Sequence, residues 1–374
     1  MAGPLQGVKV IELAGLAPAP FGAMILADFG AEVLRVERAG GKGDALTPPD
    51  GPLDRGKHTI ALDLKSTEDV GHLRALVANA DVFIEGFRPG VAERLGIGPA
   101  DLEADNPKLI YGRMTGWGQH GPLANTAGHD INYIALSGVL DLIGRAGERP
   151  LAPGNIVGDF AGGGMLLALG VIAALYERER SGKGQVIDAA MVDGAALFTS
   201  FMHGMHANGL WNQPRGENVL DGGAPFYDTY ECSDGLYVAI GCVEYPFYVQ
   251  LLTILGIDDG DLPFQLDTTG WAQLKEVIGA KLKERTRAEW TKVFANSDAC
   301  VTPVLSPWEA HQHEHNKARD AFIEVDGLLQ PAPAPRFSRT PAAHPEAETA
   351  DATAVRKLLS GWGIADNRID ALTS

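Results

Sequence analysis

The sequence predicts an α/β protein in which a large doubly wound domain precedes a smaller α+β region. Short apolar strands alternate with helical segments through the first part of the chain. The strand–helix–strand opening predicts two parallel strands, because the helix returns the chain to the end of the sheet at which the first strand began. From Tyr227 onward the pattern changes to two strands around a tight turn, which is typical of an antiparallel hairpin.

Six strands are predicted in the large domain, at Val8–Leu13, Glu32–Glu37, Thr59–Leu64, Val82–Glu85, Leu109–Met114 and Gln185–Ala189. The main helices are predicted at Pro18–Phe29, Thr67–Ala78, Asp159 to about Arg180, and Met191–Met205. Prolines suit the start of the first helix, Gly30 suits its end, and Ser66 is a cap for the second.

The second region begins with the hairpin strands Tyr227–Glu231 and Leu236–Ile240, and a proline-rich linker and a final helix, Asp351–Leu358, follow it. We therefore expect a large domain over residues 1–210 and a small α+β domain over 211–326. Residues 327–374 would form the linker and a helix that returns to the large domain.

Composition excludes several classes of protein. The 374 residues are 45% hydrophobic and 21% charged, which is ordinary for a soluble globular chain. A net charge of −17 argues against nucleic acid as a partner. The three cysteines, Cys232, Cys242 and Cys300, lack metal-ligand spacing, and from the residues before the first strand we expect no signal peptide. We expect a cytoplasmic protein with reduced thiols and no membrane span.

The first strand-to-helix turn argues against a dinucleotide cofactor. A dinucleotide-binding domain would have the pattern G-x-G-x-x-G at this turn. Here the turn reads Ala14-Gly15-Leu16-Ala17-Pro18-Ala19-Pro20, in which prolines interrupt the pattern. NAD and FAD chemistry therefore loses most of its support.

The stretch from Asn155 to Gly164 combines a polar entry, one carboxylate and a run of three consecutive glycines. We expect Asp159 at or just inside the first turn of a buried helix, where the helix dipole favours a negative charge. The glycines would let another backbone or a ligand approach closely. A capped core helix with glycines for tight packing explains the same residues, so both interpretations stay open.

Other polar residues are ambiguous when taken singly. His129, Asp130 and Glu244 could each be structural, and only convergence of His129, Asp159 and Glu244 in space would form a site. Basic residues recur in the first third of the chain, several at the ends of predicted strands where an α/β sheet holds its ligands. They are Arg35, Arg38, Lys42, Arg55, Lys57, Lys65, Arg88 and Arg94. They could bind a polyanion or form a solvated face.

Five motifs occur together: Glu85-Gly86-Phe87-Arg88-Pro89-Gly90, Met114-Thr115-Gly116-Trp117-Gly118, Gly128-His129-Asp130-Ile131-Asn132-Tyr133, Gly158-Asp159-Phe160-Ala161-Gly162-Gly163-Gly164 and Gly222-Gly223-Ala224-Pro225-Phe226-Tyr227-Asp228-Thr229-Tyr230. In this combination the chain resembles the family III CoA-transferases, the CaiB/BaiF superfamily, and within it the racemases of 2-methylacyl-CoA thioesters. The resemblance covers nearly the whole chain.

The resemblance implies a large Rossmann-like domain, a small domain and an interlocked homodimer, with each active site between the large domain of one chain and the small domain of its partner. It implies an acyl-CoA substrate, in which coenzyme A enters as part of the substrate, and neither a metal nor a nicotinamide cofactor. His129 and Asp159 match the acid–base pair, Glu244 matches the carboxylate that steadies the histidine, and Asn155 matches a polar residue beside the aspartate. The positions that match CoA contacts are Arg38, Leu62, Asp63, Leu64, Lys65, Gly86, Phe87, Arg88, Arg94, Gly128, Asp130 and Tyr133.

These residue types suit racemisation beside a thioester, which removes a proton from one face of a carbon and delivers another to the opposite face. Asp159 must be protonated for part of the cycle, so we expect apolar neighbours to raise its pKa. Backbone N–H groups at the glycine-rich helix start are candidate stabilisers of the enolate intermediate. Two alternatives remain at this point: a CoA-transferase with Asp159 as nucleophile, and an acyl-CoA-binding protein without turnover.

Overall fold

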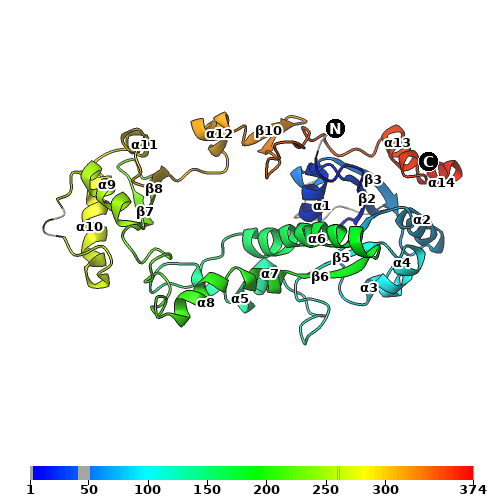
Figure 1. Ribbon diagram of the computed structural model, residues 1–374, viewed down its shortest axis with the longest axis horizontal. Helices are drawn as coiled ribbons and strands as arrows, with labels where there is room; N and C mark the ends of the chain where they lie inside the picture. The colour runs from blue at the N-terminus through cyan, green and yellow to red at the C-terminus, as the bar shows by residue number, and fades with distance from the viewer. Residues whose placement is uncertain (1–2, 41–50, 259, 261, 374) are drawn as a thin grey trace. The chain divides into compact units, whose positions relative to one another are not determined.

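The computed structural model describes residues 3–40, 51–258, 260 and 262–373. The chain forms two compact units, whose elements are labelled in Figure 1. The first unit comprises Met1–Ser137, Pro153–Phe198 and Asp320–Ser374, and the second comprises Gly138–Ala152 and Thr199–Arg319. Each unit is described separately below.

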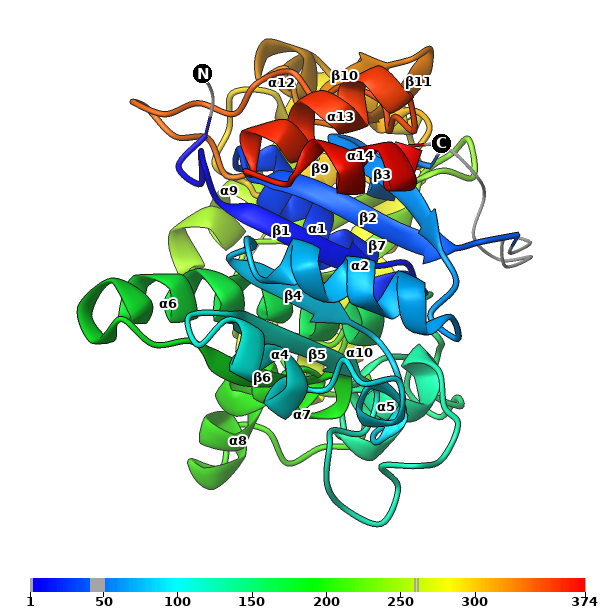
Figure 2. The same cartoon turned by 90° about the vertical axis from the view of Figure 1, so that its right-hand side faces the viewer.

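The first unit is built on a parallel sheet of six strands, in the order β3-β2-β1-β4-β5-β6. The strands are β1 (Lys9–Leu13), β2 (Glu32–Arg38), β3 (Lys57–Leu62), β4 (Val82–Glu85), β5 (Ile110–Thr115) and β6 (Gln185–Ala190). Figure 2 shows the strands running side by side. The strand order reverses between β1 and β4, so the predicted doubly wound fold is confirmed.

Helices cover both faces of this sheet. They are α1 (Pro18–Asp28), α2 (Thr67–Val77), α3 (Val91–Arg94), α4 (Pro99–Asp105), α5 (Asp130–Leu136), α6 (Leu166–Ser181), α7 (Met191–Leu197), α13 (Ala352–Gly361) and α14 (Asp366–Thr373). Successive residues of β1 enter different cores, because side chains alternate across a strand. Val10 packs with α1 and α6, whereas Ile11 packs with α2, α4 and the C-terminal helices.

The glycine-rich stretch forms a π-helix, η3 (Ile156–Met165), which continues into α6. A side chain on Gly164 would overlap the carbonyl oxygen of Pro18 in α1, and one on Gly194 of α7 would overlap the carbonyl oxygen of Gly162. The glycines thus allow backbone contact with two helices, as the packing interpretation predicts. By length and composition alone, Ile156–Ser181 could cross a membrane; one side of it packs against α1, α7 and the sheet.

The second unit contains an antiparallel sheet in the order β7-β8-β9. Its elements are β7 (Tyr227–Glu231), β8 (Tyr237–Gly241), β9 (Val301–Pro303), α8 (Ser200–Ala207), α9 (Tyr245–Leu255), α10 (Trp271–Leu282), α11 (Arg287–Phe294) and α12 (Glu314–Ala318). The predicted hairpin is present, with its second strand displaced by one residue. Phe226 lies at the centre of the core, edge-on to Tyr248 and Trp271.

The helix predicted at Met191–Met205 is wrong, because the chain forms α7 and α8 instead. Thr199, between them, has φ −82° and ψ −2°, so the backbone departs from helical geometry there. The two helices belong to different units, which places the boundary at Phe198 and Thr199 rather than near residue 210.

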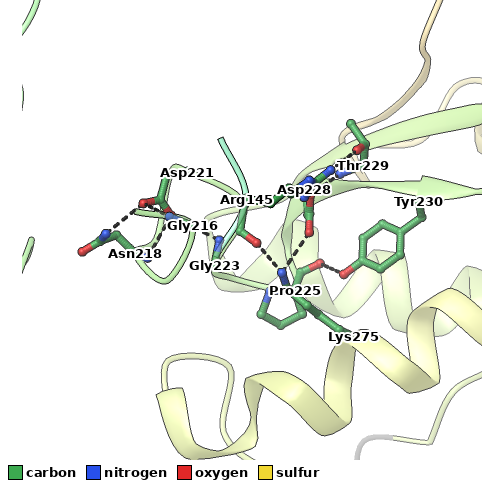
Figure 3. Close-up of polar contacts among 11 residues, drawn as sticks. Arg145, Gly216, Asn218, Asp221, Gly223, Pro225, Asp228, Thr229, Tyr230 and Lys275 are labelled. Atoms are coloured by element: carbon green, nitrogen blue, oxygen red, sulfur yellow. Dashed lines mark hydrogen bonds and ion pairs between the residues drawn. The ribbon is translucent and has the colours of Figure 1, made fainter. Parts of the chain in front are cut away.

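Residues 138–152 also differ from the predicted large domain of 1–210, because they belong to the second unit. Arg145 contacts the buried carboxylate of Asp228 at 2.5 Å, and the Lys275 ammonium contacts the same carboxylate at 2.9 Å. Figure 3 shows these three side chains pointing toward one another. Arg215 adds an ion pair with Asp141 at 2.8 Å. These contacts attach the segment to β7 and to the loop that carries Arg215, both in the second unit.

The predicted end of the small domain at residue 326 also shifts, because residues from Asp320 onward belong to the first unit. The hairpin β10 (Phe322–Val325) and β11 (Leu328–Pro331) is attached there by Arg55. Its guanidinium donates to Gln330 Oε1 at 2.8 Å and to the Pro331 carbonyl at 2.7 Å. Such contacts between residues distant in sequence have no local pattern, so the boundary could not be read from composition.

The glycine contacts predict a stability difference. We expect Gly164→Ala to lower the unfolding free energy by about 3 kcal/mol, because the new methyl group meets rigid backbone. Gly71→Ala is the matched control: Gly71 lies in α2 with open space around it, so alanine should stabilise by about 1 kcal/mol. Chemical denaturation of both variants measures the difference, and equal stability would contradict backbone packing as the role of Gly164.

Candidate active site

A cavity of about 310 Å³ opens at the carboxyl edge of the first unit's sheet. The segments after β1 and β4 line it, together with the connection between β5 and α5. These segments include Gly15, Gly86–Pro89 and Gly116–Trp117. The cavity therefore lies where the strand order reverses, which is the usual ligand position in a doubly wound sheet.

His129 lines this cavity and is exposed to solvent. It occupies the N-cap position of α5, and its backbone N–H donates to Asn132 Oδ1 at 3.1 Å. An exposed imidazole on a cavity wall can exchange protons with a bound ligand.

Aromatic packing shapes the wall beside the histidine. The rings of Trp117 and Tyr133 meet edge-on, with centroids 4.8 Å apart. The Tyr133 hydroxyl donates to the Gly128 carbonyl, and burial raises the pKa of Tyr133 to about 12, so the phenol stays protonated. A side chain on Gly116 would overlap the tyrosine ring, which explains the glycine there. Gly128 and Tyr133 thus build the wall that presents His129.

Asp159 is half-buried in η3, near the start of the helix as the sequence predicts. Its Oδ2 accepts a hydrogen bond from Asn155 Nδ2 at 3.1 Å. Burial raises the pKa of the Asp159 carboxyl and the charge of Asp130 raises it further, whereas the Asn155 hydrogen bond and His129 lower it. The upward direction agrees with the prediction, and it favours the protonated form that a general acid needs.

Asp130 connects the two candidate residues. Its Oδ2 accepts the backbone N–H groups of Gly158 at 2.6 Å and Asp159 at 2.7 Å. These two N–H groups are therefore occupied, so the expectation that the start of the glycine-rich helix stabilises an enolate is wrong for them. The structure uses them to attach η3 to the segment that carries His129.

Glu244 lies in the second unit, where it is exposed at the N-cap position of α9. Pro246 follows within the first helical turn, as is usual at a helix start. The proximity of Glu244 to His129 stays a prediction.

Three of the basic residues form ion pairs inside the first unit. For these three, neither of the two interpretations from the sequence, a ligand site or a solvated face, applies. The Arg55 guanidinium contacts Asp28 at 2.6 Å, and the Lys57 ammonium contacts Glu12 at 2.6 Å with both side chains fully buried. Arg35 contacts the carboxylate of Glu348 at 2.9 Å. Carboxylates of the protein already neutralise these cations, so they do not serve an external anion.

Four basic residues remain available: Arg38, Lys65, Arg88 and Arg94. All are exposed, and none forms an ion pair with another residue that the structure describes. Arg38 ends β2, and Arg88 follows β4 and lines the cavity. Lys42 lies outside the described residues.

Leu62, the last residue of β3, and Leu64, just after it, are expected from the sequence to contact CoA, but their side chains lie elsewhere. The Leu62 side chain is buried in the core and Leu64 packs against it, so these two side chains do not face a ligand. Asp63 is exposed, and its carboxylate accepts the Lys65 backbone N–H at 3.1 Å. This bond forms a local turn that presents the Lys65 side chain to solvent.

Sequence reasoning missed the role of Glu85 and Arg113. The Glu85 carboxylate accepts the Phe87 backbone N–H at 2.6 Å, and Arg113 of β5 donates to it at 3.0 Å. Arg113 also contacts Glu93 at 2.9 Å. This ion pair holds the loop Gly86–Arg88 at the cavity. A carboxylate within an otherwise apolar strand was the available sign in the sequence.

No group of three or more histidine, cysteine or acidic residues within the described part of the chain is arranged to hold a metal ion.

A doubly wound sheet whose switch-point cavity is lined by a histidine, with a partly buried aspartate hydrogen-bonded to the residue after that histidine, defines an α/β protein with acid–base groups at its ligand edge. Asp159 itself is not among the residues that line the cavity. The sequence profile of CoA-transferase family III matches residues 5–349, and the chain belongs to this family. It is 52% identical over 340 residues to the α-methylacyl-CoA racemase of Mus musculus, covering 90% of this chain and 87% of that protein. It is 50% identical over 339 residues to the α-methylacyl-CoA racemase of Homo sapiens, with the same coverage.

Solved structures also resemble the chain. A CaiB/BaiF family protein from Brucella suis superimposes with a TM-score of 0.81 at 28% identity, covering 96% of this chain and 100% of that one. The similarity thus extends over nearly the whole fold.

Proposed function

We propose that this protein is a racemase that interconverts (2R)- and (2S)-2-methylacyl-CoA thioesters. The observation that carries the proposal is that Asp130, directly after the cavity-lining His129, accepts the backbone N–H of Asp159, whose pKa is raised by burial. The similarity to the mouse and human proteins named α-methylacyl-CoA racemase supports the same reaction.

In this mechanism one group removes the proton from the carbon beside the thioester, and the C–H electron pair moves onto the thioester oxygen as an enolate. The other group then donates a proton to the opposite face, and the enolate collapses to the enantiomer. His129 acts as the base and Asp159 as the acid in one direction, and the reverse reaction exchanges these roles. Asn155 orients the Asp159 carboxyl through its amide, and Glu244 is assigned to steady the histidine.

The second candidate is CoA transfer, which the membership of CoA-transferase family III favours. There Asp159 would attack the thioester and form a mixed anhydride with release of the CoA thiolate. Incubation with acyl-CoA in deuterated water, with and without a free acid, separates the reactions. Exchange without the acid supports racemisation, whereas new thioester formed only with the acid supports transfer. Binding with neither outcome would indicate an acyl-CoA-binding protein.

Replacing His129 tests the mechanism directly. We expect His129→Ala to slow α-proton exchange in deuterated water by roughly 10²- to 10⁴-fold, because one general base is lost. His120→Ala is the matched control, since His120 is exposed on the same connection but does not line the cavity. Undiminished exchange into both enantiomers by His129→Ala would exclude this histidine.

The exposed cations provide the proposed contacts with the phosphates of coenzyme A. We expect Arg88→Gln to weaken CoA binding by roughly tenfold, because one charge-assisted hydrogen bond is lost, and the loss should shrink at high salt. Arg180→Gln is the control: this exposed arginine lies in the last turn of α6, just before β6 begins, at the opposite edge of the sheet. Isothermal titration with CoA measures both, and equal affinities would contradict the assignment of Arg88.

We further propose that two chains form the interlocked homodimer that the family resemblance implies. An apolar stripe along one side of α6 and the end of η3 supports it: the side chains of Met165, Leu169 and Tyr176 are 53%, 59% and 69% exposed. Light scattering should give about twice the chain mass of 39.6 kDa, and Leu169→Lys should lower it. A monomeric mass for the unaltered protein would exclude the dimer.

A further inference from the structure

The Asp130 carboxylate makes two hydrogen bonds that an ordinary helix cap does not make. It is only 4% exposed, and its Oδ2 accepts N–H groups 28 and 29 residues further along the chain. Hydrogen bonds to a charged acceptor are about twice as strong as neutral ones. The residue directly after His129 therefore fixes the backbone of Asp159.

No local side chain replaces this contact. Asn155, in the N-cap position of η3, makes no capping bond, because its amide donates to the Asp159 carboxylate instead. Gly158 also depends on the contact, since a Cβ there would lie 2.7 Å from Asp130 Oδ2. Glycine at 158 and aspartate at 130 thus form one arrangement, in which the missing side chain lets the carboxylate reach the backbone.

We propose that Asp130 is a positioning residue, whose carboxylate sets the separation of His129 and Asp159 and places a negative charge near the Asp159 carboxyl. This inference rests on the proposed racemase function. It assigns the Asp130 side chain to holding the two proton-transfer groups.

The electrostatic part of the proposal follows from what surrounds Asp159. His129 and Asp130 of the α5 segment are the titratable groups whose charges act on its carboxyl, and the Asp159 charge in turn acts on Tyr133. At the glycines that follow Asp159, the α1 and α7 helices meet η3 only through residues without a titratable side chain, namely Pro18, Phe21, Gly22, Met191, Gly194 and Ala195. The second oxygen of Asp130, Oδ1, is buried without a hydrogen-bond partner among the described residues, and no described cation pairs with the carboxylate. The negative charge of Asp130 therefore disfavours ionisation of Asp159.

Two substitutions separate position from charge. Asp130→Ala removes both hydrogen bonds, and we expect kcat for α-proton exchange to fall about 10²-fold with KM changed less than threefold, because misplacing a catalytic group has this effect. Asp130→Asn keeps an oxygen acceptor and removes the charge. It should lower kcat less, and it should move the limb of the pH profile that belongs to Asp159 to lower pH.

Asn155→Ala should move the same limb to higher pH, because it removes a hydrogen bond that favours ionised Asp159. Asp351→Ala is the matched control, since Asp351 also accepts an N–H at a helix start, that of Ala354 in α13. It should lower the melting temperature and leave the kcat and the pH profile unchanged. A purely structural role for Asp130 would reproduce this control behaviour.

Carbon-13 NMR of labelled aspartate, assigned with Asp159→Asn, follows the same titration without turnover. If the unaltered protein exchanges no α-proton, the racemase function fails, yet opposite shifts in Asp130→Asn and Asn155→Ala would still support the positioning role. Should Asp130→Ala not fold, Asp130→Asn decides. The proposal is overturned if Asp130→Asn leaves both the titration of Asp159 and the exchange profile unchanged.

Discussion

Backbone contact at glycine holds the functional part of the first unit together. Gly162 and Gly164 bring η3 so close to α7 and α1 that a side chain on either glycine would collide with the backbone of the facing helix. Interiors packed at this density transmit position accurately, because no neighbour can shift without displacing another. Asp159 lies in the same helical segment and is therefore placed by contacts that its own side chain does not make.

Pairing of buried charges decides which groups of the protein can meet a ligand. An unpaired buried charge costs several kcal/mol, so Lys57, Arg55 and Arg113 each lie beside a carboxylate. The same requirement leaves the exposed arginines at the carboxyl edge without a partner among the described residues. In a chain of net charge −17, such local cations are what makes an anionic ligand acceptable.

Between His129 and Asp159 the chain passes through the second unit. After α5, which His129 precedes, residues 138–152 are attached to the second unit by Arg145 and Arg215, and the chain then returns to form η3. The covalent path from His129 to Asp159 is therefore long, and their spacing cannot rely on it. The hydrogen bonds of Asp130 provide a direct connection instead.

The sequence by itself determined the parallel α/β architecture, because strand and helix periodicities and capping residues are local properties. The residues assigned to the chemistry rest instead on the resemblance of five motifs to a known family, and their roles stay a prediction. Only the tertiary structure decided that Lys57 forms an ion pair with Glu12 and that Leu62 belongs to the core. It also decided that residues 138–152 belong to the second unit and that Asp130 accepts the backbone N–H of Asp159. Each of these depends on a partner many residues away, and spacing along a chain does not encode which distant groups will satisfy a buried charge or N–H.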